Sequence, residues 1–477
     1  MSLRVASESV VSELVRDGLQ EILSPAGSTR YHQRVSSYFS LTAQKKPFCF
    51  IHPKTTGQVT QILQTLLANP DARFAIRSGG HVMWGASNID DGICIDLGLH
   101  MNKTSVDKEK RIVSIQPGAR WCDVYKSLEP HGIAVAGGRS GGVGVAGLLT
   151  GGGISWYIPR VGFCGDQLVN VEVVLADGRI VNANADENAD LFRALKGASA
   201  GNFGIVTRFD VRALPNDGLW AGMLLSEATP ERSADHVAAM KGFTDDSERF
   251  PDSSYIVLWN YEPSRFKDIV ITTFLANTKG VENPPELTQL CDIPTMARDL
   301  KQTNLHGFAL NYWHTTTFLN DERIMSKAVS LHAAAVAKMQ AASQTGRFSS
   351  LCLFQSLPHC YGRLGDERGG NVMRLDRALR GRNAVMLLLS VNVGGEEDEK
   401  VCGVGLAAAR EVLEGVEAFA REVDGFVDWT YLNYADRVQE PLRTLRDPEA
   451  VMRTAVKYDP TGVFQTRAPG GFKISEA

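Results

Sequence analysis

The chain has 477 residues, of which 44% are hydrophobic and 22% charged, with a formal net charge of −4 at pH 7. Because there is no basic excess to neutralise phosphates, this balance argues against nucleic acid as a partner. No apolar run is long enough to cross a bilayer, and charged residues interrupt the N-terminal segment where a signal peptide would carry its apolar core. We therefore predict an intracellular, cytoplasmic protein with no membrane partner.

Cysteine and histidine spacing argues against metal chemistry. The eight cysteines are far apart and form no C-x-x-C pair, and the ten histidines include no H-E-x-x-H motif. Structural zinc and iron–sulfur sites depend on such close spacing. We predict no metal site, and buried thiols rather than disulfides, as is usual for an intracellular chain.

Short strands and helices alternate in the first part of the chain. Apolar residues at helical spacing predict a helix within 55–70, started by a threonine N-cap. Strand patterns follow at 73–77 and 92–97. Two β-rich runs flank Asp177-Gly178, which is a strong signal for a hairpin turn.

The pattern changes after residue 215. Long strand patterns then alternate with longer helices, which predicts one antiparallel sheet covered by helices on one face, an α+β arrangement. We place the domain boundaries so that the chain divides into segments 1–215, 216–424 and 425–477. The last segment holds a tyrosine cluster, YLNY, and a helix at 448–458.

The densest motif is GGRSGGVGVAGLLTGGG at 137–153, in which nine of seventeen residues are glycine. Gly142, Gly144 and Gly147 form the G-x-G-x-x-G of dinucleotide sites, but that fingerprint requires a crossover helix after its glycines. Gly151–Gly153 should prevent such a helix, since each glycine costs about 1 kcal/mol relative to alanine. We therefore reject a nicotinamide site. The tract is typical of backbone that closely approaches a large planar or phosphorylated ligand; a tightly packed turn region is the alternative.

A second glycine loop, RSGGH, occupies residues 77–81. Ser78, Gly79 and Gly80 offer hydroxyl and amide donors that suit a pyrophosphate, which would place His81 beside the ligand. A single loop histidine is more often only hydrogen-bonded, so its functional interpretation depends on the two loops together.

Six motifs in the same order give the chain a resemblance to a known family. The two glycine loops, with EVVLADGRIV, DLFRALKGASAGNFGIVT and the C-terminal YLNYAD and YDPTGVF, resemble the berberine-bridge-enzyme-like FAD-linked oxidoreductases of the vanillyl-alcohol-oxidase (PCMH-type) fold. The ending VFQTRAPGGFKI is most similar to fungal members. The resemblance implies an α+β protein whose bipartite FAD-binding domain is built from 1–215 and 425–477. Segment 216–424 would be the inserted antiparallel-sheet substrate domain, covered by helices.

The resemblance also implies roles for particular residues. His81 matches the histidine that bonds to the flavin 8α-methyl group. Many relatives form a second bond from a cysteine to flavin C6, but here that position is Ser140, whose hydroxyl does not replace a thiolate, so we predict FAD linked through His81 only. Val143 matches a gatekeeper position where valine accompanies oxygen access. The residues assigned to the cofactor are Arg77, Ser78, Gly79, Gly80, His81, Val82, Ser87, Gly138, Ser140, Val143, Gly144, Val145, Gly147, Gly151, Gly152, Gly153, Gly204, Ile205, Val206, Tyr431 and Asn433.

A flavin carries the redox chemistry, while the protein positions the substrate and takes its proton. The family often places a tyrosine base in the YLNY stretch, which makes Tyr434 the first candidate and Tyr431 the second; the alternative is that both only pack. In the central sheet, one parity of each strand faces inward. Candidate substrate contacts there are Trp259, Tyr312, Trp313, His314, Gln355 and His359.

These observations predict an FAD-dependent oxidase. It would transfer hydride from a small alcohol, phenol or amine of secondary metabolism to the flavin, in some reactions with ring closure, and reduce O2 to H2O2. Two alternatives stay open: a carbohydrate oxidase of the same family, and a flavin-binding cyclase or binding protein without net redox turnover. The expected partners are a small-molecule substrate and O2.

Overall fold

The computed structural model describes residues 2–305, 315–343, 345–393, 399–445 and 447–476. Its first part contains a four-stranded sheet in the order β1-β2-β4-β3. The strands are β1 (Leu23–Pro25), β2 (Cys49–Ile51), β4 (Ile93–Asp96) and β3 (Phe74–Arg77). β4 pairs in parallel with both β2 and β3, and α3 (Thr56–Ala68) connects those two strands. Thr55 caps this helix by accepting a hydrogen bond from Gln58 N, so the predicted helix and its threonine cap are confirmed.

A five-stranded antiparallel sheet lies beside the first, in the order β5-β6-β10-β8-β9. Its strands are β5 (Thr104–Asp107), β6 (Ile112–Ile115), β10 (Ile205–Arg212), β8 (Leu168–Val174) and β9 (Ile180–Asn184). The turn between β8 and β9 contains Gly178 with φ +83°, a conformation that glycine adopts without strain. The hairpin predicted around Asp177-Gly178 is therefore confirmed. A two-stranded pair, β7 (Ile133–Ala134) with β11 (Leu214–Pro215), lies nearby.

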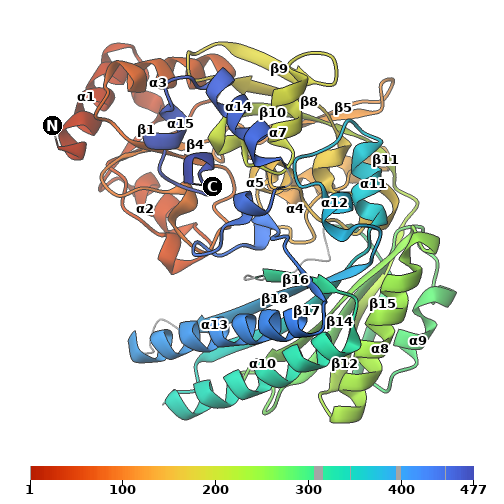
Figure 1. The fold of residues 1–477 in the computed structure, drawn as a ribbon. Coiled ribbons are helices and arrows are strands. Elements are labelled where there is room, and N and C mark those ends of the chain that lie inside the picture. The colour runs from red at the N-terminus through yellow and green to blue at the C-terminus, as the bar shows by residue number, and fades with distance from the viewer. Residues whose placement is uncertain (1, 306–314, 344, 394–398, 446, 477) are drawn as a thin grey trace.

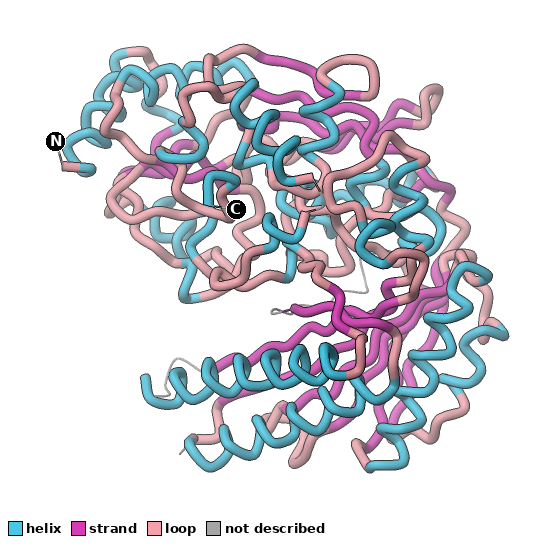
Figure 2. Tube along the Cα trace, viewed as in Figure 1, coloured by secondary structure: helices cyan, strands magenta, loops and turns pink. Residues whose placement is uncertain are grey.

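The predicted antiparallel sheet has eight strands, in the order β15-β12-β14-β13-β17-β18-β16-β19. The strands are β12 (Leu219–Glu227), β13 (Ser253–Tyr261), β14 (Val270–Asn277), β15 (Ala297–Thr303), β16 (Thr315–Leu319), β17 (Phe348–Leu357), β18 (Ala384–Val393) and β19 (Phe426–Val427). Helices α8 (Pro230–Asp246), α10 (Glu322–Ala342) and α13 (Glu399–Glu422) cover one face (Figures 1 and 2). Trp259 and Phe354 point toward these helices, whereas Ile256 and Leu353 point to the opposite face, as strand alternation requires.

The C-terminal segment returns to the first part of the molecule (Figure 1). β19 pairs with β16 at the edge of the large sheet, after which α14 (Pro448–Tyr458) packs on α7 (Ala189–Leu195). Arg467 donates hydrogen bonds to the carbonyls of Leu66, Asn69 and Ala72. The N- and C-terminal segments therefore share one structural unit, the arrangement that the family resemblance implied; the boundary residues 215 and 424 stay predictions.

The remaining helices are short or peripheral. They are α1 (Leu3–Arg16), α2 (Thr29–Ser36), α4 (Trp121–Leu128), α5 (Val145–Thr150), α6 (Ile158–Val161), α9 (Thr288–Cys291), α11 (Cys360–Asp366), α12 (Leu375–Leu379) and α15 (Val463–Thr466). No helix in the described part of the chain combines the length and hydropathy that a membrane span needs.

Candidate active site

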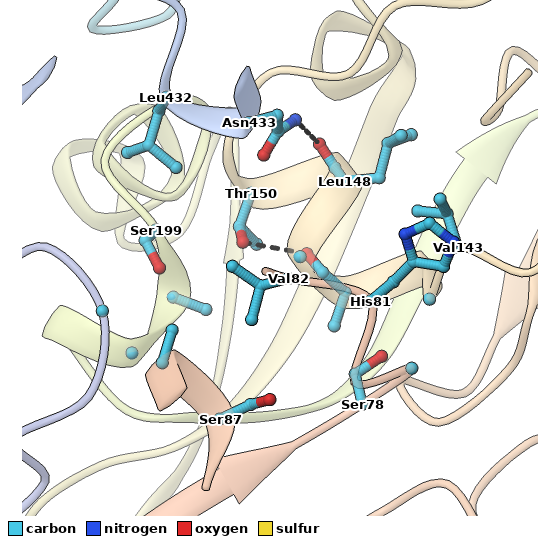
Figure 3. A pocket seen from close by; sticks show the side chains of 18 of the residues that line it. Ser78, His81, Val82, Ser87, Val143, Leu148, Thr150, Ser199, Leu432 and Asn433 are labelled. Atoms are coloured by element: carbon cyan, nitrogen blue, oxygen red, sulfur yellow. Dashed lines mark hydrogen bonds between the residues drawn. The ribbon is translucent and has the colours of Figure 1, made fainter. Parts of the chain in front are cut away.

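A cavity of about 340 Å³ lies where the first part of the molecule meets the uncovered face of the large sheet. This volume is in the range of small-molecule sites. Its walls come from segments far apart in the sequence, and Figure 3 shows several of them around one space. The wall segments fall within 75–87, 139–154, 199–206, 431–435 and 468–473, joined by Leu97, Pro117, Ile256 and Leu353.

Most of the residues predicted for the site line this one cavity. They are Ser78, Gly79, Gly80, His81, Val82, Ser87, Ser140, Val143, Gly144, Gly147, Gly204, Ile205, Val206, Tyr431, Asn433 and Tyr434. The fold thus brings together both glycine loops, the NFGIVT stretch and the tyrosine cluster.

The two glycine loops touch each other at Gly79 and Gly144. A Cβ atom on either residue would overlap the backbone nitrogen of the other. Arg120 holds the crossing in place, because its guanidinium donates to Gly79 O at 2.6 Å and also to Gly142 O. Part of the glycine content is therefore required by backbone packing, while residues of the same loops line the cavity.

Gly147 has a different environment. It lies within α5, lines the cavity, and an added Cβ would meet nothing within 4 Å. Helix propensity alone would favour alanine here by about 1 kcal/mol, so protein packing gives no reason for this glycine. The open space beside its backbone fits a ligand that approaches closely.

The glycine triplet acts indirectly. The sequence predicted that no crossover helix would follow the tract; α5 does form there, but it is only six residues long and ends at Gly151. A Cβ on Gly151 would overlap Asn433 Oδ1, while Gly152 (φ +110°) faces Met373 and Gly153 (φ +81°) faces Cys164. The triplet thus makes room for neighbouring side chains and does not itself line the cavity. Asn433 uses this room to donate from Nδ2 to Leu148 O at 3.0 Å (Figure 3).

Three other residues predicted for the cofactor also lie outside the cavity wall. The buried Arg77 guanidinium donates to Arg34 O and Ser37 Oγ and lies 3.7 Å from an oxygen of Asp96, so it anchors the loop after β3. Gly138 packs against the Trp121 ring. Val145 belongs to the core of the first part.

His81 and Ser140 both line the cavity and also share a neighbouring groove with Cys122. His81 is partly exposed, and its ring stacks on Phe39 with centroids 4.2 Å apart. No cysteine lines the cavity in the part of the chain that the structure describes. The nearby Cys164 is buried, and this burial raises its pKa to about 12, which keeps it a thiol at neutral pH.

The YLNY stretch forms a 3-10 turn, Leu432–Tyr434, which brings both tyrosines to one place with ring centroids 4.9 Å apart. Tyr431 is fully buried, and this burial raises the pKa of its phenol well above the ordinary value. Its Oη accepts a hydrogen bond from Asn433 Nδ2 at 3.1 Å. Tyr434 is only half-buried, and its Oη accepts from Arg139 Nη2 at 2.7 Å. Both phenols line the cavity, and Tyr434 is the more exposed of the two.

Arg139 lines the cavity and was missed by the sequence reasoning. Its guanidinium donates to Tyr434 and to Gln355 Oε1, and lies 5.4 Å from the centroid of the Trp156 ring. These hydrogen-bond partners are 216 and 295 positions away along the chain, so no local spacing reveals them. The one feature of the sequence that could have indicated Arg139 is that it is the single charged residue in a glycine tract.

Among the other candidate substrate contacts, Gln355 and Trp259 lie on different faces of the central sheet. Gln355 lies on the same face as Leu353. Trp259 points to the helices and donates to Ser233 Oγ at 3.0 Å, so it is not a cavity residue. His359 hydrogen-bonds to Asn383. Tyr312, Trp313 and His314 lie outside the described residues.

The FAD binding domain family matches residues 47–184. The FAD-dependent monooxygenase sdcF of Emericella nidulans is 35% identical over 94% of this chain and 95% of its own length. The chain belongs to the family of FAD-linked oxidoreductases that includes this FAD-dependent monooxygenase. The predicted family, the PCMH-type fold and the assignment as an FAD-dependent oxidoreductase are confirmed.

Solved structures support the fold of this FAD-linked oxidoreductase. Berberine bridge enzyme is 15% identical, with a TM-score of 0.76 over 97% of this chain and 100% of its own. Glucooligosaccharide oxidase from Acremonium strictum, which carries a 6-S-cysteinyl, 8α-N1-histidyl FAD, is 17% identical, with a TM-score of 0.76 over 95% of this chain and 97% of its own. The cavity fits FAD in this chain, since both glycine loops line it and the backbone at Gly147 is open to close approach by a ligand.

Gly147 provides a test of this fit. In Gly147→Leu we expect the flavin content per protein to fall about tenfold or more, because a fitted cofactor tolerates no overlap with an added side chain. Compared with flavin-free wild type, the variant should not lose thermal stability, since a Cβ at this position meets no neighbour and leucine favours the helix. The measurements are the ratio of visible to ultraviolet absorbance and a melting curve. Gly403→Leu, at a position on α13 with the same open surroundings, is the matched control, and full flavin content in Gly147→Leu would contradict the fit.

Proposed function

We propose that this FAD-linked oxidoreductase is an oxidase for small organic substrates, namely alcohols, phenols or amines of secondary metabolism. It would hold FAD covalently through His81 alone and deliver the substrate's electrons to O2. The observation that carries the proposal is Tyr434, a half-buried phenol hydrogen-bonded to the Arg139 cation in the cavity that both glycine loops line.

FAD, when bound, accepts a hydride from the substrate and passes the two electrons to O2, which gives H2O2. The chain's own residues manage the proton. Because Tyr434 Oη accepts its hydrogen bond from Arg139, the other side of that oxygen is left to face the substrate's hydroxyl or amine. In its phenolate form, Tyr434 can then take the proton as the hydride departs and become the neutral phenol.

The remaining walls of the cavity are apolar and determine its shape. Ile256 and Leu353 from the large sheet and Leu148 from α5 are apolar cavity residues, which exclude water from the reacting atoms. Val143, at the gatekeeper position, also lines the cavity, and its small side chain supports oxygen access. Tyr431 packs edge-on against Tyr434 and fixes its ring.

Two alternatives come from different observations. Relatives that are 35% and 33% identical are named monooxygenases. A monooxygenase inserts one oxygen atom into its substrate and needs a further two electrons from a reductant. Several structural neighbours oxidise carbohydrates. Both of these reactions also use the flavin, so the product and the fate of O2 distinguish them from the proposed oxidase.

The test uses the purified flavin-containing protein and a panel of phenols, alcohols, amines and oligosaccharides. We expect one of the first three classes to bleach the visible flavin band without oxygen, and air to restore the band with one H2O2 per product. Under 18O2 the product should carry no label. Labelled product, formed with consumption of a nicotinamide reductant, would identify a monooxygenase. Reduction of the flavin by oligosaccharides alone would identify a carbohydrate oxidase. Product formed without any reduction of the flavin would identify a cyclase.

A further inference from the structure

Arg139 brings a positive charge to the cavity that no acidic residue in the described part of the chain balances. Its side chain is 9% exposed, and no carboxylate of the described residues lies within ion-pair distance of its guanidinium. Both of its hydrogen bonds leave from one atom, Nη2, toward Tyr434 and Gln355. A buried cation without a counter-charge is costly to keep in a folded protein. The buried Arg77, by contrast, has Asp96 beside it.

Gln355 adds a second unmatched donor. Its side chain is 3% exposed, and Oε1 accepts from Arg139. Since a guanidinium only donates, this contact fixes which end of the amide faces Arg139, and Nε2 is the end left over. Nε2 is buried and has no hydrogen-bond partner among the described residues. Buried amide donors are almost always paired, so the position fits an acceptor that comes with a ligand.

Strand geometry places these donors on the substrate side. On β17, Gln355 shares a face with Leu353, because side chains two residues apart point the same way. Leu353 and its neighbour Ile256 line the cavity, and Ile256 is paired with Gln355 across the sheet. The guanidinium, the amide and the Tyr434 hydroxyl therefore form one polar cluster bordered by apolar wall.

We infer that Arg139 and Gln355 form a binding site for an anionic oxygen of the substrate, a carboxylate or a phenolate. The inference rests on the proposed function and narrows its substrate class to acidic molecules with an apolar body. The free guanidinium nitrogens of Arg139 and Gln355 Nε2 would bind the oxygen and hold the carbon to be oxidised beside Tyr434. A neutral sugar would find few polar partners on the walls formed by Ile256 and Leu353.

The experiment titrates flavin-containing holoenzyme with benzoate, with 4-nitrophenolate and with the neutral isostere benzamide. Binding is followed by calorimetry and by the change in the visible flavin spectrum. We expect benzoate or 4-nitrophenolate to bind about 10- to 100-fold more tightly than benzamide, the range for a charge-assisted hydrogen bond in a desolvated site. The tighter of the two anions identifies the kind of oxygen.

Variants localise the effect. Arg139→Met should remove the preference for the anion while benzamide affinity stays within about twofold, and Arg139→Lys should retain part of the preference. Arg160→Met is the matched control, because Arg160 on α6 pairs with Asp252 and does not line the cavity. Gln355→Leu gives an independent reading should Arg139→Met lose its flavin, and it should weaken anion binding about tenfold.

Equal affinity of the wild type for benzoate and benzamide would overturn the anion site, as would unchanged benzoate binding in both Arg139→Met and Gln355→Leu. None of these readings depends on turnover. If the protein prefers benzoate but releases no peroxide with any substrate, the oxidase proposal is contradicted and the anion site is supported. If the protein is an oxidase but shows no preference for the anion, the oxidase proposal is supported and the anion site is contradicted.

Discussion

Tyr434→Phe is expected to lower kcat by about 10²–10⁴-fold, the usual contribution of a positioned acid–base group. The substitution removes only the hydroxyl that accepts from Arg139, so KM and flavin content should change little. The decisive measurement is the rate of flavin reduction by substrate in an anaerobic stopped-flow experiment, because this rate isolates the chemical step from reoxidation by O2.

Tyr431→Phe is the matched control for this prediction. It removes the hydroxyl of a fully buried phenol, whose hydrogen-bond partner is Asn433. Its reduction rate should stay within about tenfold of the wild type, far above that of Tyr434→Phe. Similar losses in both variants would mean that the two tyrosines support the site by packing, and an unimpaired Tyr434→Phe would exclude this phenol as the base.

His81→Ala is expected to abolish covalent attachment of the flavin. In the wild type, acid precipitation should leave the yellow colour in the protein pellet, on the peptide that contains His81. In the variant all colour should move to the supernatant, because Ser140 offers no thiolate and no described cysteine lines the cavity. The measurements are visible spectra of the pellet and the supernatant and the mass of the peptide that contains residue 81.

The exposed His131 is the control for that substitution, since it lies on the surface turn Glu129–His131. His131→Ala should keep all its flavin in the pellet. Flavin that stays attached in His81→Ala would reveal a second link and contradict the single attachment. A wild type whose colour moves entirely to the supernatant would remove the covalent proposal and leave the fold unaffected.

Features set by local chemistry could be predicted from the sequence. Gly178 marked a hairpin because its turn needs a positive φ, and Thr55 marked a helix start because its hydroxyl reaches the backbone of Gln58. The glycine loops were recognisable for the same reason. Two edge-side strands of the large sheet, β12 and β15, were not predicted; β15 is largely exposed and polar, so it lacks the alternation on which strand prediction depends.

Features set by distant partners were out of reach. Arg139 becomes a cavity residue through Gln355 and Tyr434, which the fold alone brings next to it. Arg77 was assigned to the cofactor because it begins the RSGGH loop, yet its guanidinium turns to Asp96 on the adjacent strand. Sequence proximity to a ligand loop does not determine the direction of a long side chain.

The tail contact has a consequence for the order of events in the cell. Ala75 and Lys473 belong to the same cavity wall, and Asn202 holds the tail in place by donating to Phe472 O at 3.0 Å. The ribosome synthesises Ala75 long before Lys473, and contacts between residues so distant in sequence form slowly. The cofactor can therefore be enclosed only after residues 468–473 have been synthesised and have folded back onto the first part of the molecule.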